Sequence, residues 1–167
     1  MKRIVFVISL LFTLLILTVG YKTAYAESSA SYCLITDSNT GASNQDQLMS
    51  QLQEKIDGHL IDPETTEEAI NEVMGTGVPV ENADYDELQA IGQNLEADYV
   101  IVLRSYNDTQ SYEDVHTVDC ELDIIKVGSD IQKTFTGNFT VPVEDNVEDE
   151  TYNALDEFLE SLEPLHL

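Results

Sequence analysis

The sequence of 167 residues holds 32 acidic and only 7 basic side chains, so its formal net charge at pH 7 is −25. A field of this sign repels nucleic acids and anionic membrane surfaces, which excludes both as partners. It favours basic partners, cations or simple solubility. The chain carries only two cysteines, so a disulfide-rich scaffold is excluded as well.

The first 26 residues have the pattern of a secretory leader. Lys2 and Arg3 give a positive start, an apolar run follows from Ile4 to Val19, and residues 24–26 match the small-x-small pattern at which signal peptidase cleaves. The alternative is an uncleaved anchor over 4–21, but polar residues and a glycine dilute this run, and a membrane span needs about 20 residues. We therefore predict an exported protein, periplasmic or extracellular, with its signal peptide (1–26) cleaved after Ala26.

The mature chain is predicted to be a short tail, 27–30, followed by a single α/β domain, 31–167. Three basic residues and no acidic ones leave with the leader, so the mature chain has 4 basic and 32 acidic side chains and a net charge of −28. Cys33 lies well beyond the apolar run, which argues against a lipoprotein. A chain of this length can bury one core without a metal ion or several disulfides.

Cys33 and Cys120 allow one intramolecular disulfide. Export permits oxidation, and a bridge that closes so long a loop could stabilise the fold by about 4–5 kcal/mol. The alternative is a pair of buried free thiols on apolar strand faces. The sequence leaves both interpretations open.

The first half of the domain predicts alternating strands and helices. Residues 32–36 form an apolar run typical of a strand, and the polar residues 37–44 indicate a loop. A helix follows with Leu48, Leu52 and Ile56 on one face, Asn44 as its cap and Gly58 at its end. Residues 59–61 predict a short second strand.

Two more helices precede the second long strand. Asp62 is a typical N-cap before Pro63, and this helix is predicted to stop at Gly75, before an irregular stretch, 75–79. Asp84 and Glu87 have the spacing of a capping box. The β-branched run 99–103 then predicts a strand that is buried on both faces.

The second half predicts an antiparallel hairpin and a closing helix. Apolar residues alternate with acids over 118–124 and with polar residues over 131–141, and Gly128 lies in the turn between them. Residues 152–162 carry an apolar helical stripe after an acidic stretch, and Pro164 closes the helix. The predicted fold is α/β: a mixed sheet with a central parallel pair and an antiparallel hairpin, with helices mainly on one face.

The segment 85–102 (YDELQAIGQNLEADYVIV) resembles a signature of bacterial envelope proteins, in which a helix leads through Ala-Asp-Tyr into a strand. That set includes the N-terminal domain of the translocation protein TolB, the curli secretion protein CsgG and many small exported proteins. The order of elements in those families is similar over most of residues 31–162. The resemblance implies a non-catalytic interaction or accessory module of the cell envelope, and it assigns no catalytic residue.

Candidate sites for zinc or nucleophilic catalysis are weak. His116 and Cys120 are four residues apart and would share a strand face, but a structural zinc site needs four ligands. Only these two arise locally, and His59 and Cys33 are possible ligands from elsewhere in the chain. Both cysteines lie among apolar neighbours, which disfavours an activated Cys–His pair. The sequence has no Gly-x-Ser-x-Gly elbow, and with so many acids a close carboxylate pair has no diagnostic value.

Calcium is the better ion hypothesis. The stretch 37–41 (Asp-Ser-Asn-Thr-Gly) begins like a calcium loop, but its glycine comes one position early, and Leu48 stands where a bidentate glutamate is required. A denser acidic patch, 144–150, is equally explained by a helix start. Asn107 and Asn138 match the glycosylation pattern, which carries no weight if the source is bacterial, as the resemblance implies.

The sequence therefore predicts no catalytic, cofactor-binding or metal-ligating residues. The first hypothesis is an exported, non-catalytic module that binds another protein of the cell envelope. The alternative is an acidic, calcium-responsive exported protein, with weak calcium binding as its only cofactor. A third is an enzyme whose active site the sequence does not reveal.

Overall fold

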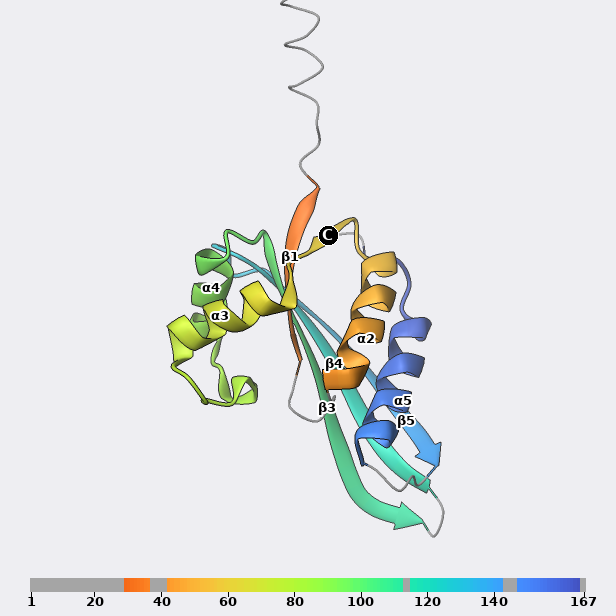
Figure 1. Cartoon of the computed structure of the whole chain (residues 1–167). Coiled ribbons are helices and arrows are strands. Elements are labelled where there is room, and N and C mark those ends of the chain that lie inside the picture. The colour runs from red at the N-terminus through yellow and green to blue at the C-terminus, as the bar shows by residue number, and fades with distance from the viewer. Residues whose placement is uncertain (1–28, 37–41, 113–114, 143–146, 166–167) are drawn as a thin grey trace, which may run out of the picture.

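The computed structural model describes residues 29–36, 42–112, 115–142 and 147–165 (Figure 1). They contain one five-stranded mixed sheet of order β2-β1-β3-β4-β5. The strands are β1 (Ala30–Thr36), β2 (Gly58–Leu60), β3 (Tyr99–Tyr112), β4 (Val115–Lys126) and β5 (Gln132–Pro142). β1 is parallel to both of its neighbours, and β3, β4 and β5 are antiparallel. The predicted mixed α/β sheet is confirmed, with three parallel strands in place of two.

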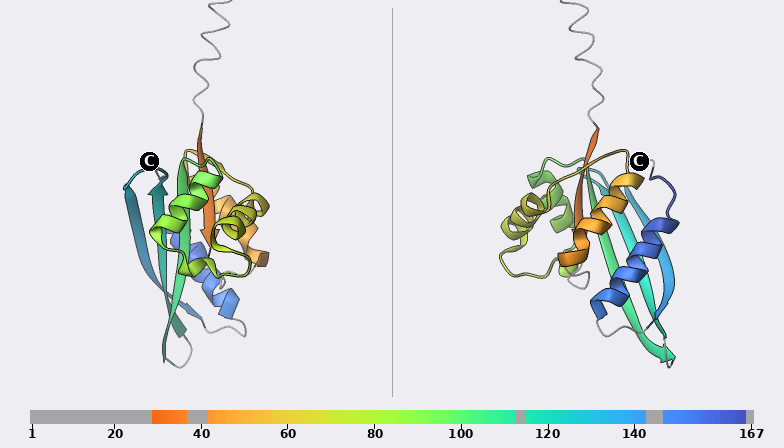
Figure 2. Two further views of the ribbon diagram at one scale, coloured as in Figure 1. Left: turned by 90° about the vertical axis from the view of Figure 1, so that its left-hand side faces the viewer. Right: turned by 45° about the vertical axis from the view of Figure 1, so that its right-hand side comes forward.

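The helices divide between the two faces of the sheet. They are α2 (Ala42–Lys55), α3 (Pro63–Met74), the short 3-10 turn η2 (Val80–Asn82), α4 (Tyr85–Asn94) and α5 (Val147–Ser161). Figures 1 and 2 show α2 and α5 on one face and α3 and α4 on the other. We expected helices mainly on one face, and the handedness of the crossovers explains the difference. The chain leaves β1 in one direction to reach β2 and returns past β1 to reach β3, so two right-handed crossovers place their helices on opposite faces.

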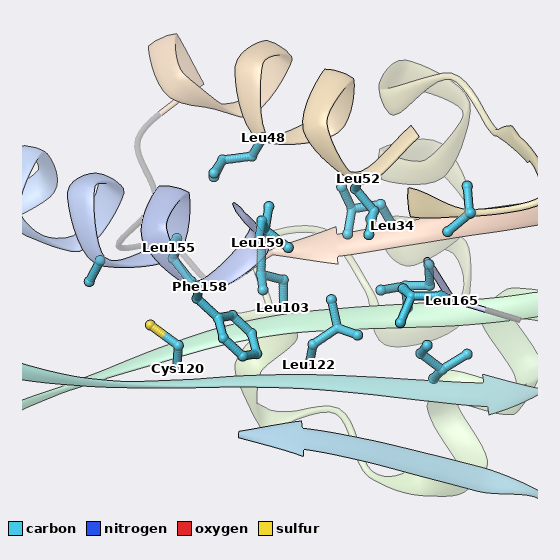
Figure 3. Close-up of a cluster of buried hydrophobic side chains, with 14 of the residues drawn as sticks. Leu34, Leu48, Leu52, Leu103, Cys120, Leu122, Leu155, Phe158, Leu159 and Leu165 are labelled. Carbon is cyan, nitrogen blue, oxygen red and sulfur yellow. The ribbon is translucent and has the colours of Figure 1, made fainter. Parts of the chain in front are cut away.

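Each face therefore has its own hydrophobic core. The larger cluster joins α2 and α5 to the sheet through Leu52, Phe158 and Leu122, among others (Figure 3). The smaller cluster joins α3 and α4 to β1 and β3. The side chains of residues 100–103 alternate between the two clusters, and each is at most 2% exposed. This confirms the prediction that the run 99–103 is a strand buried on both faces.

The two cysteines are not joined by a disulfide, and each is buried in a different cluster. Cys33 pairs with Val100 of β3 and Cys120 pairs with Ser105. Because Val100 and Ser105 are an odd number of residues apart on the same strand, their faces are opposite. The sheet itself thus lies between the two sulfur atoms.

We expect both thiols of the exported protein to stay reduced, because a disulfide through the sheet is sterically barred. The measurement is alkylation of the unfolded protein without reductant, followed by mass spectrometry. Two added alkyl groups are expected, and the same mass should result when reductant is present. A protein that takes up alkyl groups only after reduction would contradict this arrangement.

The N-termini of α3 and α4 follow the predicted capping patterns, and that of α2 does not. The Asp62 carboxylate accepts hydrogen bonds from the N–H groups of Glu64 and Thr65. Asp84 and Glu87 form the predicted capping box, with backbone-to-carboxylate distances of 2.9 Å in both directions. Asn44 is not the cap of α2, because this helix begins at Ala42, so Asn44 lies within its first turn.

The Ala-Asp-Tyr segment of the sequence signature connects α4 to the sheet. The Asp98 carboxylate accepts hydrogen bonds from the backbone N–H and the hydroxyl of Ser31, at 2.8 and 3.0 Å, which join the start of β3 to β1. The Tyr99 ring stacks on Tyr32 with 5.1 Å between the ring centroids. Glu96, the residue before this segment, has a φ of 52°. The N–H of Ala97 donates a hydrogen bond to the carbonyl of Gly92, so α4 ends in a Schellman motif.

Replacing Glu96 with glycine is expected to raise the free energy of unfolding by about 1 kcal/mol, because glycine adopts this left-handed conformation without strain. The change also removes a negative charge from a helix C-terminus, where it is unfavourable. Glu96→Gln isolates that second effect and should stabilise by less. Urea denaturation of the three proteins measures the difference, and equal stability of the two variants would contradict the strain.

Candidate interaction surface

The candidate site is the part of the sheet that α3 and α4 leave uncovered. Figure 2, left, shows β4 and β5 uncovered beside these helices. Register places the side chains of alternate residues there, a set that we call the open face: Arg104, Tyr106, Asp119, Glu121, Asp123, Gln132, Thr134, Thr136 and Asn138. All nine are polar, in contrast to the apolar residues of the same strands that point toward α5.

Asp123 is the centre of a charged network in the part of the open face near the turn between β4 and β5. Asp123 is 6% exposed, and its carboxylate accepts hydrogen bonds from Arg104 at 2.7 Å, Gln132 at 3.0 Å and Thr134 at 2.5 Å. Arg104 also bridges to Glu121 at 3.1 Å. Burial disfavours the Asp123 carboxylate, but these hydrogen bonds and the Arg104 charge outweigh it, so the pKa of Asp123 lies below its ordinary value.

The part of the open face farther from the turn between β4 and β5 is hollowed and more exposed. Asp119 accepts a hydrogen bond from the side chain of Asn138 at 2.6 Å. A shallow depression of about 420 Å³ lies there, lined by Tyr106, Asp119, Glu121 and Thr136 among others. Tyr106 is 52% exposed, which is unusual for a large aromatic side chain on a sheet. This region has the form of a contact surface rather than of a deep pocket.

The open face ends at a long, regular edge strand. β5 has 11 residues and pairs with β4 without a register shift, whereas the opposite edge, β2, has only 3 residues. The N–H of Lys126 bonds the carbonyl of Ile131, which fixes the phase of the β4–β5 ladder. In an antiparallel pair the direction of the backbone groups alternates, so Gln132 and every second residue after it point their N–H and C=O groups away from β4.

These outward residues of β5 are Gln132, Thr134, Thr136, Asn138 and Thr140. No other strand of the described ranges lies beyond them. An edge of this length is a template for pairing with another chain. Pro142, at the next outward position, has no N–H, which fits an edge strand.

The sequence candidates for a metal site are not brought together. The Nδ1 atom of His116 lies 2.7 Å from Glu150 of α5, while Cys120 lies in the larger core and Cys33 in the smaller one. His59 contacts Ser29. Among the residues that the structure describes, no group of three histidine, cysteine or acidic residues is arranged to hold a metal ion.

Only some of the residues that the calcium hypothesis named are among the described residues. The stretch 37–41 and the acids Glu144 and Asp145 lie outside the described residues. Glu148, Asp149 and Glu150 form the first turn of α5, as the helix-start interpretation predicts. Of the two glycosylation patterns, Asn138 lies on the open face, and the side chain of Asn107 is outside the description.

A second cleft, of about 240 Å³, lies at the carboxyl end of β1 beside the first turns of α3. Its lining contains Thr36, Glu64, Thr66 and Glu67 but neither a cysteine nor a histidine. The Cys33 thiol donates a hydrogen bond to the hydroxyl of Thr66. Burial raises the pKa of this thiol to about 12, and the hydrogen bond to Thr66 lowers the pKa by less than burial raises it. The Cys33 thiol is therefore not activated for nucleophilic attack.

Sequence reasoning predicted the polar faces of the two hairpin strands, β4 and β5, but it did not extend this face to Arg104 and Tyr106 of β3. The signal that it passed over is Arg104, which follows directly after the apolar run 99–103. A cation at the point where a buried strand becomes polar indicates that the cover of the sheet ends there. For the edge position of β5 the sequence offers Pro142 at the end of the strand, which fits an edge but does not assign one.

Within the described residues, the fold and the open face define a small α/β module whose sheet ends at the unpaired edge of β5. No protein-family model and no curated protein matches the sequence. The fold is similar to that of lipoprotein GNA1162 from Neisseria meningitidis, with a TM-score of 0.51 and 13% identity over 80% of this chain and 99% of that one.

Weaker likenesses extend to two further bacterial proteins. The C-terminal domain of LpoB from Salmonella enterica aligns with a TM-score of 0.47 and 13% identity over 68% of this chain and 82% of that one. A PelC dodecamer from Paraburkholderia phytofirmans aligns with a TM-score of 0.45 and 13% identity over 84% and 92%. At 13% identity the likeness to GNA1162 concerns the fold alone, and the resemblance to TolB and CsgG stays a prediction. None of the described helices is both long and apolar enough to cross a membrane.

Proposed function

We propose that this chain is an exported, non-catalytic accessory module of the bacterial cell envelope, which acts by binding another envelope protein. The observation that carries the proposal is the polar open face joined to the long edge of β5, which no other strand in the described part of the chain covers. A surface of this kind suits protein contact, because side chains and unpaired backbone groups face solvent together. The fold likeness to a Neisseria lipoprotein supports the envelope setting.

Export by a cleaved leader is part of the proposal. The residues that carry the leader pattern, 1–26, lie outside the described ranges, and β1 begins only four residues beyond the proposed cleavage site. Cys33 is buried within β1 and paired with Val100, which is incompatible with an acylated N-terminal cysteine at that position. N-terminal sequencing of the exported protein should begin at Glu27, and a chain that begins at Met1 would indicate an anchor instead.

Affinity capture tests the binding function. The mature protein is immobilised and exposed to a solubilised envelope fraction, with an equally acidic unrelated protein on a parallel support as the charge control. We expect one protein to be retained in a saturable manner and to be released by free mature protein at physiological salt. Retention equal to that on the control support would contradict the proposal, because it would report charge alone.

We also propose that cations act on this protein by screening and not at a specific site. The charge of the chain is high, and weak, delocalised cation binding follows from it. We expect millimolar calcium to raise the melting temperature by about a degree and magnesium to do the same. A calcium shift several times the magnesium shift, abolished by chelator, would support the calcium-responsive alternative.

A further inference from the structure

The two edges of the sheet differ in a way that bears on how a partner is held. β2 is too short to accept a strand along its length, whereas β5 offers five successive outward residues without a bulge. Sheet edges in monomeric proteins are commonly protected by charge, proline, bulges or short length. The outward residues of β5 from 132 to 140 are uncharged, and proline comes only at 142.

We propose that β5 binds an extended, basic segment of the partner protein as a sixth strand of the sheet. The proposal rests on the proposed binding function and adds the surface and the chemistry of its ligand. Main-chain hydrogen bonds to the outward residues would supply the contact, and alternate side chains of the segment would lie over the open face.

The acidic residues of β4 indicate that the bound segment should be basic. On the strand next to β5, Asp119, Glu121 and Asp123 point to the open face, and Arg104 is the cation that pairs with two of them. An added strand would lie about 10 Å from β4, because neighbouring strands are separated by about 4.8 Å. Lysine or arginine side chains at every second position can extend across β5 toward Asp119 and Glu121.

The same charges disfavour a second copy of this chain as the occupant. Antiparallel pairing of two β5 strands would bring two acidic open faces into one continuous surface, at a net charge of −25 for each full chain. A basic segment removes the repulsion that self-pairing would create. The occupant is therefore assigned to another protein.

Amide hydrogen exchange provides the test, because the ladder makes a prediction for each residue of β5. The probe is a synthetic peptide of about ten residues in which threonine and lysine alternate. In the free protein, the amides of residues 133, 135, 137, 139 and 141 point toward β4 and should be protected, and those of 132, 134, 136, 138 and 140 should exchange freely. On addition of the peptide, the second set should become protected and the first should change little.

Two control peptides separate strand addition from simple charge attraction. A peptide of the same sequence, N-methylated at every second residue, keeps the charge but loses the hydrogen-bonding edge, and its affinity should fall at least about tenfold. A threonine–glutamate peptide should not bind. Equal affinity of the methylated and unmethylated peptides would overturn the proposal.

Two protein variants complete the test. Asp119→Asn removes a charge from the open face and should weaken the lysine peptide about threefold, whereas Glu68→Gln removes one from α3 and should leave the affinity unchanged. Protection of the outward amides in the free protein, at concentrations at which it sediments as a dimer, would assign the edge to self-association and overturn the heterologous occupant. If envelope capture succeeds while the peptide leaves the exchange of β5 unaltered, the binding function stands and the strand-addition mode fails.

Discussion

Replacement of Asp123 by alanine is expected to lower the free energy of unfolding by about 3 kcal/mol. The buried carboxylate accepts hydrogen bonds from Arg104, Gln132 and Thr134, so the change leaves three donors without their acceptor. The loss of the acceptor is most costly for the guanidinium of Arg104, because this side chain is only 16% exposed and Glu121 is then its remaining charged partner. Urea denaturation monitored by circular dichroism measures the loss.

Two further variants test whether the loss of stability in Asp123→Ala comes from the buried network. Asp119→Ala, on the same strand and face, removes an exposed acid that accepts a hydrogen bond from Asn138, and it should cost no more than about 1 kcal/mol. The double variant Arg104→Met with Asp123→Leu replaces the pair by apolar side chains and should recover much of the stability lost in Asp123→Ala. If Asp123→Ala cost no more than Asp119→Ala, the network would have no role in holding the sheet.

The Asp123 network also predicts how stability depends on pH. The pKa of Asp123 in the folded protein lies below its ordinary value of 3.8, so the unfolded chain binds a proton at higher pH than the folded one. The stability that the carboxylate contributes is therefore fully present above about pH 5 and is lost as the pH falls through the folded-state pKa. The difference in melting temperature between the protein and Asp123→Asn should shrink below that range, and a constant difference down to strongly acidic pH would contradict the assignment.

Asp123 also shows what alternation in a sequence can and cannot predict. The pattern over 118–124 assigned the acids of β4 to one face and the apolar residues to the other, and the structure has them so. It also predicted that the acidic face is wet, which holds for Asp119 but not for Asp123. Periodicity identifies a face, but the burial of one position depends on where covering helices end and which neighbours reach across.

The same limit applies to the arrangement of the elements. Helix caps at Asp62 and Asp84 and the buried strand at 99–103 could be predicted, because each depends on residues a few positions apart. The faces on which the helices lie depend on strand order, which brings β1 between β2 and β3 and is not encoded within any short window. The free edge of β5, which carries the proposed function, belongs to this second group of features.

Gly58 shows how strongly that strand order constrains single residues, and Gly58→Ala is expected to cost about 3 kcal/mol of stability. A Cβ at Gly58 would lie 2.1 Å from the carbonyl oxygen of Ala30 and 2.5 Å from the ring of Tyr32. Neither neighbour can give way easily, because the first is backbone of β1 and Tyr32 is 2% exposed. β2 must therefore move off β1, with loss of the bond from the N–H of Ile61 to the Tyr32 carbonyl.

The matched control is Gly128→Ala, which tests glycine replacement without crowding. Nothing lies within 4 Å of a Cβ there, but φ is +73°, so strain alone should cost about 1 kcal/mol. Urea denaturation ranks the two variants, and hydrogen exchange at Ile61 reports the separation of β2. Equal cost at the two positions, with the Ile61 amide still protected in Gly58→Ala, would mean that β1 and β2 do not approach as closely as 2.1 Å implies. Because β5 lies at the other edge of the sheet, Gly58→Ala should leave the alternating exchange pattern of β5 intact wherever the protein stays folded.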